Sequence, residues 1–248
     1  MNPIFVAEGL HMRFGDRVVL EDITLAFPEG RLSGIMGPNG AGKTTCFNVL
    51  TGRYRPSRGR VTFRGRDITG LPPRAIARLG VSRSFQMMNL FDEETAGDNV
   101  LLALPGLRAR GFQAWRSATD DARLLARARD VLDRVGLADK ADQPARALSY
   151  GERRALEIAV ALAADPAVLF LDEPTSGLGT DATQRLARLV ESLKRQVTLV
   201  VIEHDMEFLF GLADQVAVIH WGQVIARGTP AELRANPWVQ RSNLGRLG

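Results

Sequence analysis

A glycine-rich loop between an apolar strand and a helix restricts the possible folds of this chain more than any other feature. The apolar run Leu32–Met36 predicts a buried strand, and residues 43–50 predict a helix. From Gly37 to Thr44 the sequence reads Gly-Pro-Asn-Gly-Ala-Gly-Lys-Thr, which is the spacing of a phosphate-binding loop in the strand-loop-helix setting that this loop requires. A glycine-rich turn that only caps a helix is the alternative, but the strand, the spacing, the lysine and the threonine all favour a nucleotide site.

The residues of this loop suit a phosphate ligand. Glycines allow successive backbone N–H groups to turn toward phosphate oxygens, and the N-terminus of the following helix adds a dipole of the right sign. Lys43 is expected to reach the β- and γ-phosphates of ATP, and Thr44 is expected to ligate Mg²⁺. The residues predicted to contact the nucleotide here are Gly37, Pro38, Asn39, Gly40, Ala41, Gly42, Lys43, Thr44 and Thr45.

Two acidic residues directly follow a second apolar strand. The continuous apolar run Val168–Leu171 is typical of a strand buried on both faces, and it is followed by Asp172 and Glu173. Ligands of α/β sheets bind at the carboxyl ends of the strands. Asp172 is therefore expected in the Mg²⁺ shell, and Glu173 is expected to polarise the attacking water as a general base. The alternative is that the two acids only make the strand end soluble, and the phosphate loop upstream favours the catalytic interpretation.

A third motif lies between the first two. The pentapeptide Leu148–Glu152 reads Leu-Ser-Tyr-Gly-Glu and precedes a helical run from Arg153 to Ala163. Ser149 is a plausible helix N-cap, which alone would be common. The order of phosphate loop, pentapeptide and paired acids resembles the ABC ATPase family. The signature of that family is usually Leu-Ser-Gly-Gly-Gln, so Tyr150 and Glu152 depart from it.

The resemblance implies an α/β fold, the P-loop NTPase cassette, with a mostly parallel core sheet, an N-terminal antiparallel β subdomain and an inserted helical subdomain. The residue patterns agree with it. Alternating apolar residues near the start predict antiparallel strands, and helical periodicity dominates between residues 99 and 164. We therefore expect one ABC ATPase domain over residues 1–248, with a catalytic lobe at about 1–98 and 165–248 and a helical signature subdomain at about 99–164. Leu124, Leu125, Ala128, Val131, Leu132 and Val135 would share one helix face, and Gly136 would end that helix.

Further site residues follow from the resemblance. Gln86 resembles the Q-loop glutamine that senses Mg²⁺ and the transporter, although it could be a polar residue in a turn. His204, after the strand Val197–Ile202, resembles the switch histidine that contacts the γ-phosphate, although a lone histidine is more often structural. Phe14 matches the aromatic residue that stacks on adenine, or it is an ordinary core aromatic. Glu173, His204 and Gln86 are thus the catalytic candidates, and Thr44, Gln86 and Asp172 are the candidates for binding Mg²⁺.

The resemblance also implies that the chain works as a dimer. In ABC proteins each ATP lies between the phosphate loop of one chain and the signature of another. Ser149 and the backbone N–H of Gly151 would present donors at a helix N-terminus to the γ-phosphate. The second cassette could be another copy of the chain or a sister ATPase subunit. Gly179, where the family commonly has Asp or Asn in the D-loop, puts the usual contact of that loop with the opposite site in doubt.

Within the family, nearly the whole chain resembles the ATP-binding subunits of branched-chain amino acid importers. The resemblance lies in Tyr150 with the run Arg153–Ala159, in the segment Gly80–Val100, in the tail Gly228–Leu233 with Asn243–Gly245, and in the longer connection Leu104–Trp115. It implies transmembrane permease subunits as partners and a periplasmic binding protein as an indirect one. The transported substrate does not touch the cassette, so urea, short amides and aromatic acids stay open. A lipopolysaccharide-export ABC ATPase, a non-transport ABC protein and an unrelated P-loop enzyme are the rival interpretations.

The composition predicts a cytoplasmic protein, and the resemblance implies a peripheral subunit on the cytoplasmic face of the inner membrane. The formal net charge is +4, with basic and acidic residues interleaved. This pattern indicates a solvated arginine-rich surface, and no nucleic acid partner is expected. Cys46 is the only cysteine, which excludes an internal disulfide and fits a reducing compartment. We expect neither a secretory signal nor a membrane-spanning segment.

Overall fold

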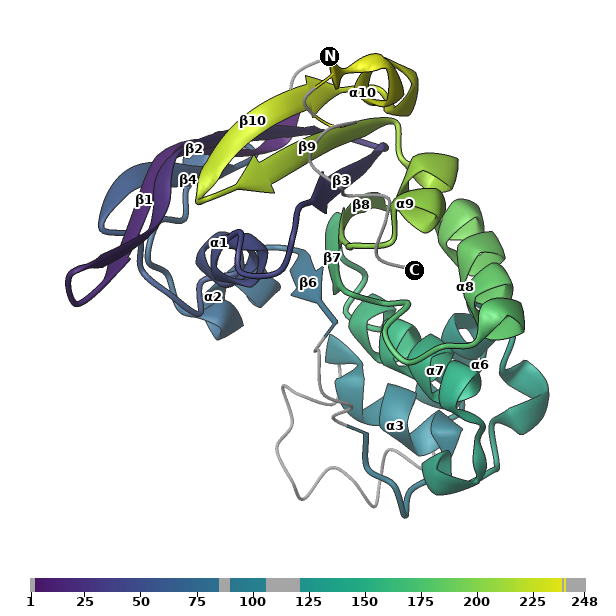
Figure 1. The fold of residues 1–248 in the computed structure, drawn as a ribbon. Coiled ribbons are helices and arrows are strands. Elements are labelled where there is room, and N and C mark those ends of the chain that lie inside the picture. Colours follow the sequence, from purple (N-terminus) through teal and green to yellow (C-terminus); the bar gives the residue numbers. More distant parts are fainter. Residues whose placement is uncertain (1–2, 85–89, 106–120, 238, 240–248) are drawn as a thin grey trace.

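The computed structural model describes residues 3–84, 90–105, 121–237 and 239. Its centre is a six-stranded sheet in the order β10-β9-β3-β8-β7-β6 (Figure 1). The strands are β3 (Leu32–Met36), β6 (Val81–Arg83), β7 (Val168–Asp172), β8 (Thr198–Ile202), β9 (Gln215–His220) and β10 (Gln223–Gly228). All neighbouring pairs are parallel except the hairpin of β9 and β10. The predicted mostly parallel core sheet is thus confirmed.

An antiparallel sheet forms the N-terminal part of the molecule. It has the order β2-β1-β4-β5 and consists of β1 (Pro3–Phe14), β2 (Arg17–Pro28), β4 (Arg58–Phe63) and β5 (Arg66–Asp67). The register between β1 and β2 shifts between Ala7 and Leu10, where Gly9 has a φ of 56°. Because of this bulge, the buried side of β1 changes from Phe5 and Ala7 before it to Leu10 and Met12 after it.

Helices cover both faces of the core sheet because each buried strand sends alternate side chains to opposite sides. Phe170 of β7 packs in one hydrophobic cluster with α1 (Lys43–Leu50) and the antiparallel sheet. Leu169 and Leu171 pack in a second cluster on the other face. The helices that contribute to this second cluster are α3 (Ala96–Ala103), α6 (Ala122–Arg134), α7 (Tyr150–Leu162), α8 (Thr180–Leu193), α9 (Met206–Leu212) and α10 (Pro230–Ala235).

The helical region between β6 and β7 follows the predicted period. Asp121 caps α6, and Gly136 follows its end with a φ of 73°, as expected. Ala128, Val131 and Leu132 are buried, but Leu125, which was predicted on the same face, is 39% exposed. Figure 1 shows α3, α6 and α7 gathered on one side of the core sheet, away from the antiparallel sheet and α1. The precise subdomain limits remain a prediction.

Several elements had no clear sequence signal. The short helices α2 (Pro73–Arg78), α9 and α10 and the two-residue strand β5 were not predicted. Within the part of the chain that the structure describes, no helix is long and apolar enough to cross a bilayer. Most of the predicted connection Leu104–Trp115, from residue 106 to residue 115, lies outside the described residues. Gln86 and Asn243–Gly245 also lie outside them.

Candidate functional site

The phosphate loop joins the end of β3 to the start of α1. Gly42 is the N-cap of α1 and has a φ of 101°, a backbone conformation that favours glycine. Gly37 lies against β9, since a Cβ at this position would lie 2.1 Å from the carbonyl oxygen of Ile219. The N–H of Gly222 in the β9–β10 turn donates to the carbonyl of Ala41 at 2.9 Å. The loop is therefore fixed from behind by the β9–β10 hairpin.

Lys43 lies buried inside this loop. Its ammonium donates to the carbonyl oxygens of Gly37 at 2.8 Å and Pro38 at 3.0 Å. Burial lowers the pKa of Lys43, and the nearby carboxylates of Glu173 and Asp172 oppose that shift. Thr44, the next residue, is exposed at the start of α1. The loop thus encloses the ammonium of Lys43 and leaves Thr44 exposed to solvent.

Asp172 ends β7 as a buried carboxylate. Burial raises its pKa to about 6, and the negative charge of Glu173 adds to the shift, which Arg83 and Lys43 oppose. Its Oδ1 atom is buried and has no hydrogen-bond partner among the described residues. An unpartnered buried carboxylate oxygen is well suited to a hard cation. The described residues contain no cluster of three or more His, Cys, Asp or Glu side chains that could hold a metal.

Glu173 and His204 lie at the carboxyl ends of two adjacent parallel strands, β7 and β8. The Nδ1 atom of His204 lies 3.9 Å from Oε1 of Glu173. Glu173 has a φ of 45°, a left-handed conformation that is costly for a residue with a side chain and is concentrated at functional sites. Its N–H donates to the carbonyl of Ile202 at 2.8 Å. The sheet thus brings Lys43, Asp172, Glu173 and His204 near one another, and their catalytic and binding roles stay predictions.

Glu203 is a site residue that sequence reasoning missed. It is fully buried, and its Oε1 accepts hydrogen bonds from the N–H of Thr175 at 2.8 Å and from its hydroxyl at 2.6 Å. Its Oε2 accepts from the N–H of His204 at 3.1 Å. The carboxylate therefore joins the loop after Glu173 to the loop that carries His204. An acidic residue ending an otherwise apolar strand, next to the candidate histidine, was the available signal.

Replacing Glu203 by alanine is expected to lower the free energy of unfolding by about 2–4 kcal/mol, because two buried donors of Thr175 and the partly buried N–H of His204 lose a charged acceptor. Glu203→Gln retains one acceptor oxygen and is expected to lose less. Urea denaturation of both variants measures the difference. Loss of stability by the alanine variant no greater than that of Glu207→Ala, an exposed position on α9, would contradict the bridging role.

The signature residues cap a helix. Ser149 is the N-cap of α7, and its hydroxyl accepts from the N–H of Glu152 at 3.4 Å. The carboxylate of Glu152 in turn accepts from the N–H of Ser149 at 2.8 Å, which completes a capping box. Ser149 is exposed. Gly151 lies close to α8, since a Cβ added at Gly151 would lie 3.2 Å from the Cβ of Ala182. The helix end is thus presented to solvent on the helical part of the molecule.

Tyr150 links the signature to the D-loop of the same chain. Its hydroxyl donates to the carbonyl of Ser176 at 3.1 Å. Gly177 has a φ of 76°, and a Cβ there would lie 2.9 Å from that hydroxyl. The tyrosine that departs from the usual signature therefore fixes the loop that follows Glu173.

The substitution Gly177→Ala is expected to cost about 2 kcal/mol of unfolding free energy, about half from the left-handed backbone and half from the contact with Tyr150. Gly65→Ala is the matched control, because Gly65 has a φ of 74° and open space around it. In the background of Tyr150→Phe, the cost of Gly177→Ala should fall toward that of Gly65→Ala. Equal costs in both backgrounds, measured by thermal denaturation, would contradict the contact.

Not every predicted residue joins the site. Phe14 lies at the end of β1, 46% exposed, in an edge-on contact with Tyr54 at a centroid distance of 5.4 Å. Its ring is accessible to a base, so its predicted role stays a prediction. Gly179 is exposed and has no atom near the position of a Cβ. Gln86 lies outside the described residues.

Comparison with known proteins decides the family. The sequence profile of the ABC transporter family matches residues 20–176. The chain belongs to the ABC transporter family. Over nearly its whole length it is similar to the high-affinity branched-chain amino acid transport ATP-binding proteins LivG of Salmonella typhimurium, with 41% identity covering 98% of both chains, and BraF of Pseudomonas aeruginosa, with 40% identity and the same coverage.

The remaining comparisons agree with this assignment. The lipopolysaccharide export system ATP-binding protein LptB of Acidithiobacillus ferridurans is less similar, at 32% identity over 99% of this chain and 98% of that protein. Among solved structures, the ADP conformation of MJ1267, an ATP-binding cassette of an ABC transporter, has a TM-score of 0.87 at 28% identity and covers 99% of this chain and 100% of that one. The predictions of an ABC cassette fold and of an ATP-hydrolysing subunit are confirmed.

Proposed function

We propose that this ABC cassette binds and hydrolyses ATP to drive import of branched-chain amino acids or related small polar or amide substrates. The observation that carries the proposal is the similarity to LivG, at 41% identity across 98% of both chains. The weaker similarity to the lipopolysaccharide export protein, at 32%, disfavours the export alternative. As in LivG-type systems, the partners would be transmembrane permease subunits and, through them, a periplasmic binding protein. The cassette would then lie peripherally on the cytoplasmic face of the membrane.

ATP would lie on the loop Gly37–Thr45, with its terminal phosphates over Lys43. The ammonium of Lys43 exchanges the carbonyls of Gly37 and Pro38 for phosphate oxygens. Mg²⁺ would be held by Thr44 and Asp172, with Gln86 as a third candidate, and would neutralise charge that develops on the β- and γ-phosphates. Phe14 would stack on the adenine.

Hydrolysis would follow from the pair at the strand ends. Glu173 accepts a proton from the attacking water, and His204, 3.9 Å from it, contacts the γ-phosphate. Ser149 and the N–H of Gly151 of a second cassette, either another copy or a sister subunit, complete the site from the other side. Loss of the γ-phosphate contacts lets the two cassettes separate, so nucleotide binding energy becomes a domain movement.

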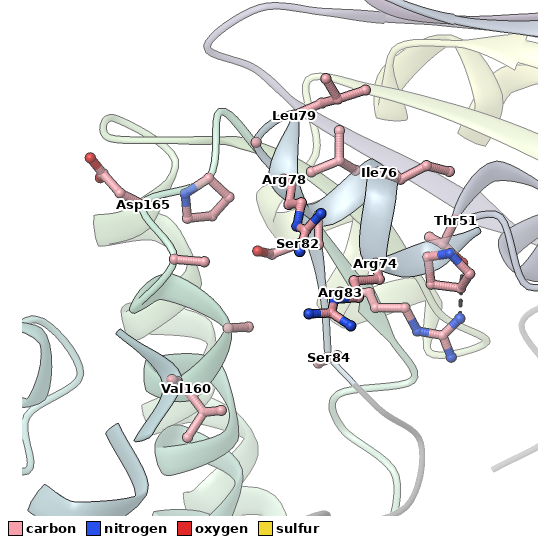
Figure 2. A pocket seen from close by; sticks show the side chains of 18 of the residues that line it. Thr51, Arg74, Ile76, Arg78, Leu79, Ser82, Arg83, Ser84, Val160 and Asp165 are labelled. Atoms are coloured by element: carbon pink, nitrogen blue, oxygen red, sulfur yellow. Dashed lines mark hydrogen bonds between the residues drawn. The ribbon is translucent and has the colours of Figure 1, made fainter. Parts of the chain in front are cut away.

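A large cavity offers a place for the permease. It measures about 1100 Å³ and lies between α2, β6 and α7 (Figure 2). Arg74 and Arg78 of α2 line it, are exposed, and have no ion-pair partner among the described residues. An unpaired basic rim is complementary to an acidic segment, so we assign this cavity to an acidic cytoplasmic segment of the permease.

Reversing these two charges tests the assignment. The double variant Arg74→Glu and Arg78→Glu is expected to keep its basal ATPase activity and to lose co-purification with the permease subunits. The control carries Arg123→Glu and Arg129→Glu, two exposed positions on α6. Retention of permease by the first variant, or equal loss in both, would contradict the docking surface.

Uptake into proteoliposomes tests the whole proposal. The cassette, reconstituted with the proposed permease chains and binding protein, should import radiolabelled leucine in an ATP-dependent manner. Excess valine and isoleucine should compete, and acetamide, urea and phenylalanine define the limits of the substrate class. Recovery of ribosomes or DNA in place of permease chains in an affinity purification would argue against transport.

A further inference from the structure

The fifth signature residue places a negative charge at a helix end that is proposed to receive a phosphate. Glu152 occupies the position where the usual signature has glutamine. Hydrogen bonds hold its pKa at about 2, the largest contribution coming from Lys140 and the next from the backbone of Ser149. The side chain is therefore ionised at every working pH. A carboxylate in the first turn suits an isolated helix, but it repels an approaching phosphate.

The same carboxylate holds the hydroxyl of Ser149. The Ser149 hydroxyl donates to Oε2 of Glu152 at 2.8 Å, as does the Ser149 N–H. Both donors that Ser149 could offer to a γ-phosphate are thus directed at Glu152 in this conformation. How strongly Glu152 retains them, and how much charge it presents, depends on what binds its other oxygen.

Lys140 binds that other oxygen. It closes a short 3-10 turn, Ala138–Lys140, in the connection between α6 and α7, and its ammonium forms an ion pair with Oε1 of Glu152. The two side chains are 29% and 31% exposed, so the pair is neither fully solvated nor buried. Lysine occurs in this chain only at positions 43, 140 and 194, whereas arginine is frequent. The pair cancels the charge of Glu152 and draws its carboxylate toward the connection.

We propose that Lys140 is a positioning residue for the composite nucleotide site: by neutralising Glu152, it enables the Ser149 end of α7 to accept the γ-phosphate of ATP bound to a second cassette. The inference rests on the proposed function, since it requires the two-cassette site. It predicts that the charge of Glu152 is harmful only when Lys140 is absent. A purely structural cap would show no such dependence.

The experiment measures ATP-driven dimerisation in a Glu173→Gln background by sedimentation. Lys140→Met should raise the ATP concentration for half-maximal dimerisation about tenfold, and more at low salt, because each new interface gains two unpaired carboxylates beside phosphates. In the chain with Glu173 intact, KM should rise with little change in kcat. ATP binding to the monomer should stay the same, because Lys43 and its loop are untouched.

The decisive comparison repeats the Lys140→Met measurement in a chain that also carries Glu152→Gln. In that background, Lys140→Met should shift half-maximal dimerisation by less than about twofold, since no charge is left to neutralise. Arg146→Met is the control: it removes a positive charge from the same connection, but its partner is Glu93. An unchanged midpoint for Lys140→Met, or an equal defect with and without Glu152→Gln, would overturn the inference. If the parent Glu173→Gln chain fails to dimerise at saturating ATP, alone and with its permease complex, the proposed function fails instead.

Discussion

Replacement of Glu173 by glutamine is expected to lower kcat for ATP hydrolysis about 10²–10³-fold while ATP still binds. The amide keeps the size and the hydrogen-bonding reach of the carboxylate but cannot accept the proton of the attacking water. Because the γ-phosphate is then retained, the closed two-cassette state should accumulate. Steady-state phosphate release measures the first effect, and sedimentation with Mg²⁺ and ATP measures the second.

Two comparisons make this result specific to Glu173. Glu207→Gln changes an exposed glutamate on α9 and should leave turnover unchanged. His204→Ala should reduce turnover and weaken the closed state together, because it removes the proposed contact with the γ-phosphate. Turnover by Glu173→Gln near the wild-type rate would show that another group takes the proton.

Asp172→Asn should abolish Mg²⁺-dependent ATP hydrolysis and, without nucleotide and metal, stabilise the fold. The pKa of Asp172 is raised from 3.8 to about 6 in the folded chain. A carboxyl whose pKa is raised by folding does not destabilise the fold below about pH 4, where it is protonated in both states. Its destabilising effect on the free energy of unfolding grows as the pH rises and reaches its full size above about pH 6. This difference between the two pKa values corresponds to roughly 3 kcal/mol. Since a buried asparagine also leaves polar atoms unpaired, the expected net gain is about 1–2 kcal/mol at pH 7.5.

The pH dependence of the stabilisation by Asp172→Asn shows whether it arises from the charge of the carboxylate. Urea unfolding of wild type and Asp172→Asn at pH 4.5 and pH 7.5, with EDTA present, should show the stabilisation only at the higher pH. Adding Mg²⁺ and ATP should then stabilise the wild type and leave the variant nearly unaffected. Equal stability of the two chains at pH 7.5 would show that the carboxylate of Asp172 has another partner.

The sequence was sufficient for the parts of the fold that local patterns determine. The strands β7 and β8 lie in continuous apolar runs, β3 lies in the mostly apolar segment Leu32–Met36, and each motif is next to one of these strands or caps a helix. The structure brings Lys43, Asp172, Glu173 and His204 together, and their roles stay predictions. The helix α6 and its stop at Gly136 followed from the 3.6-residue period. In these places local preference and tertiary packing agree.

Other features depend on contacts between distant segments. The bulge near Gly9 changes which residues of β1 are buried, because a register shift of one residue moves every following side chain to the opposite face of the sheet. Leu125 is apolar and correctly spaced but lies at the edge of its helix face. Glu203 and Lys140 gain their roles from Thr175 and Glu152, partners that only the fold brings near. Neither pair lies within a single helix or strand, so the periodicity of one element does not predict it.

The hydrogen bonds of Glu203 and Tyr150 end on two neighbouring residues of one loop, Thr175 and Ser176. One set runs from the N–H of His204 through Glu203 to Thr175, and the other from the neighbouring carbonyl of Ser176 to the hydroxyl of Tyr150 at the start of α7. In a two-cassette assembly, the His204 end would face a subunit's own ATP and the Tyr150 end the ATP of its mate. A displacement of the loop Thr175–Ser176 would therefore alter hydrogen bonds at both ends.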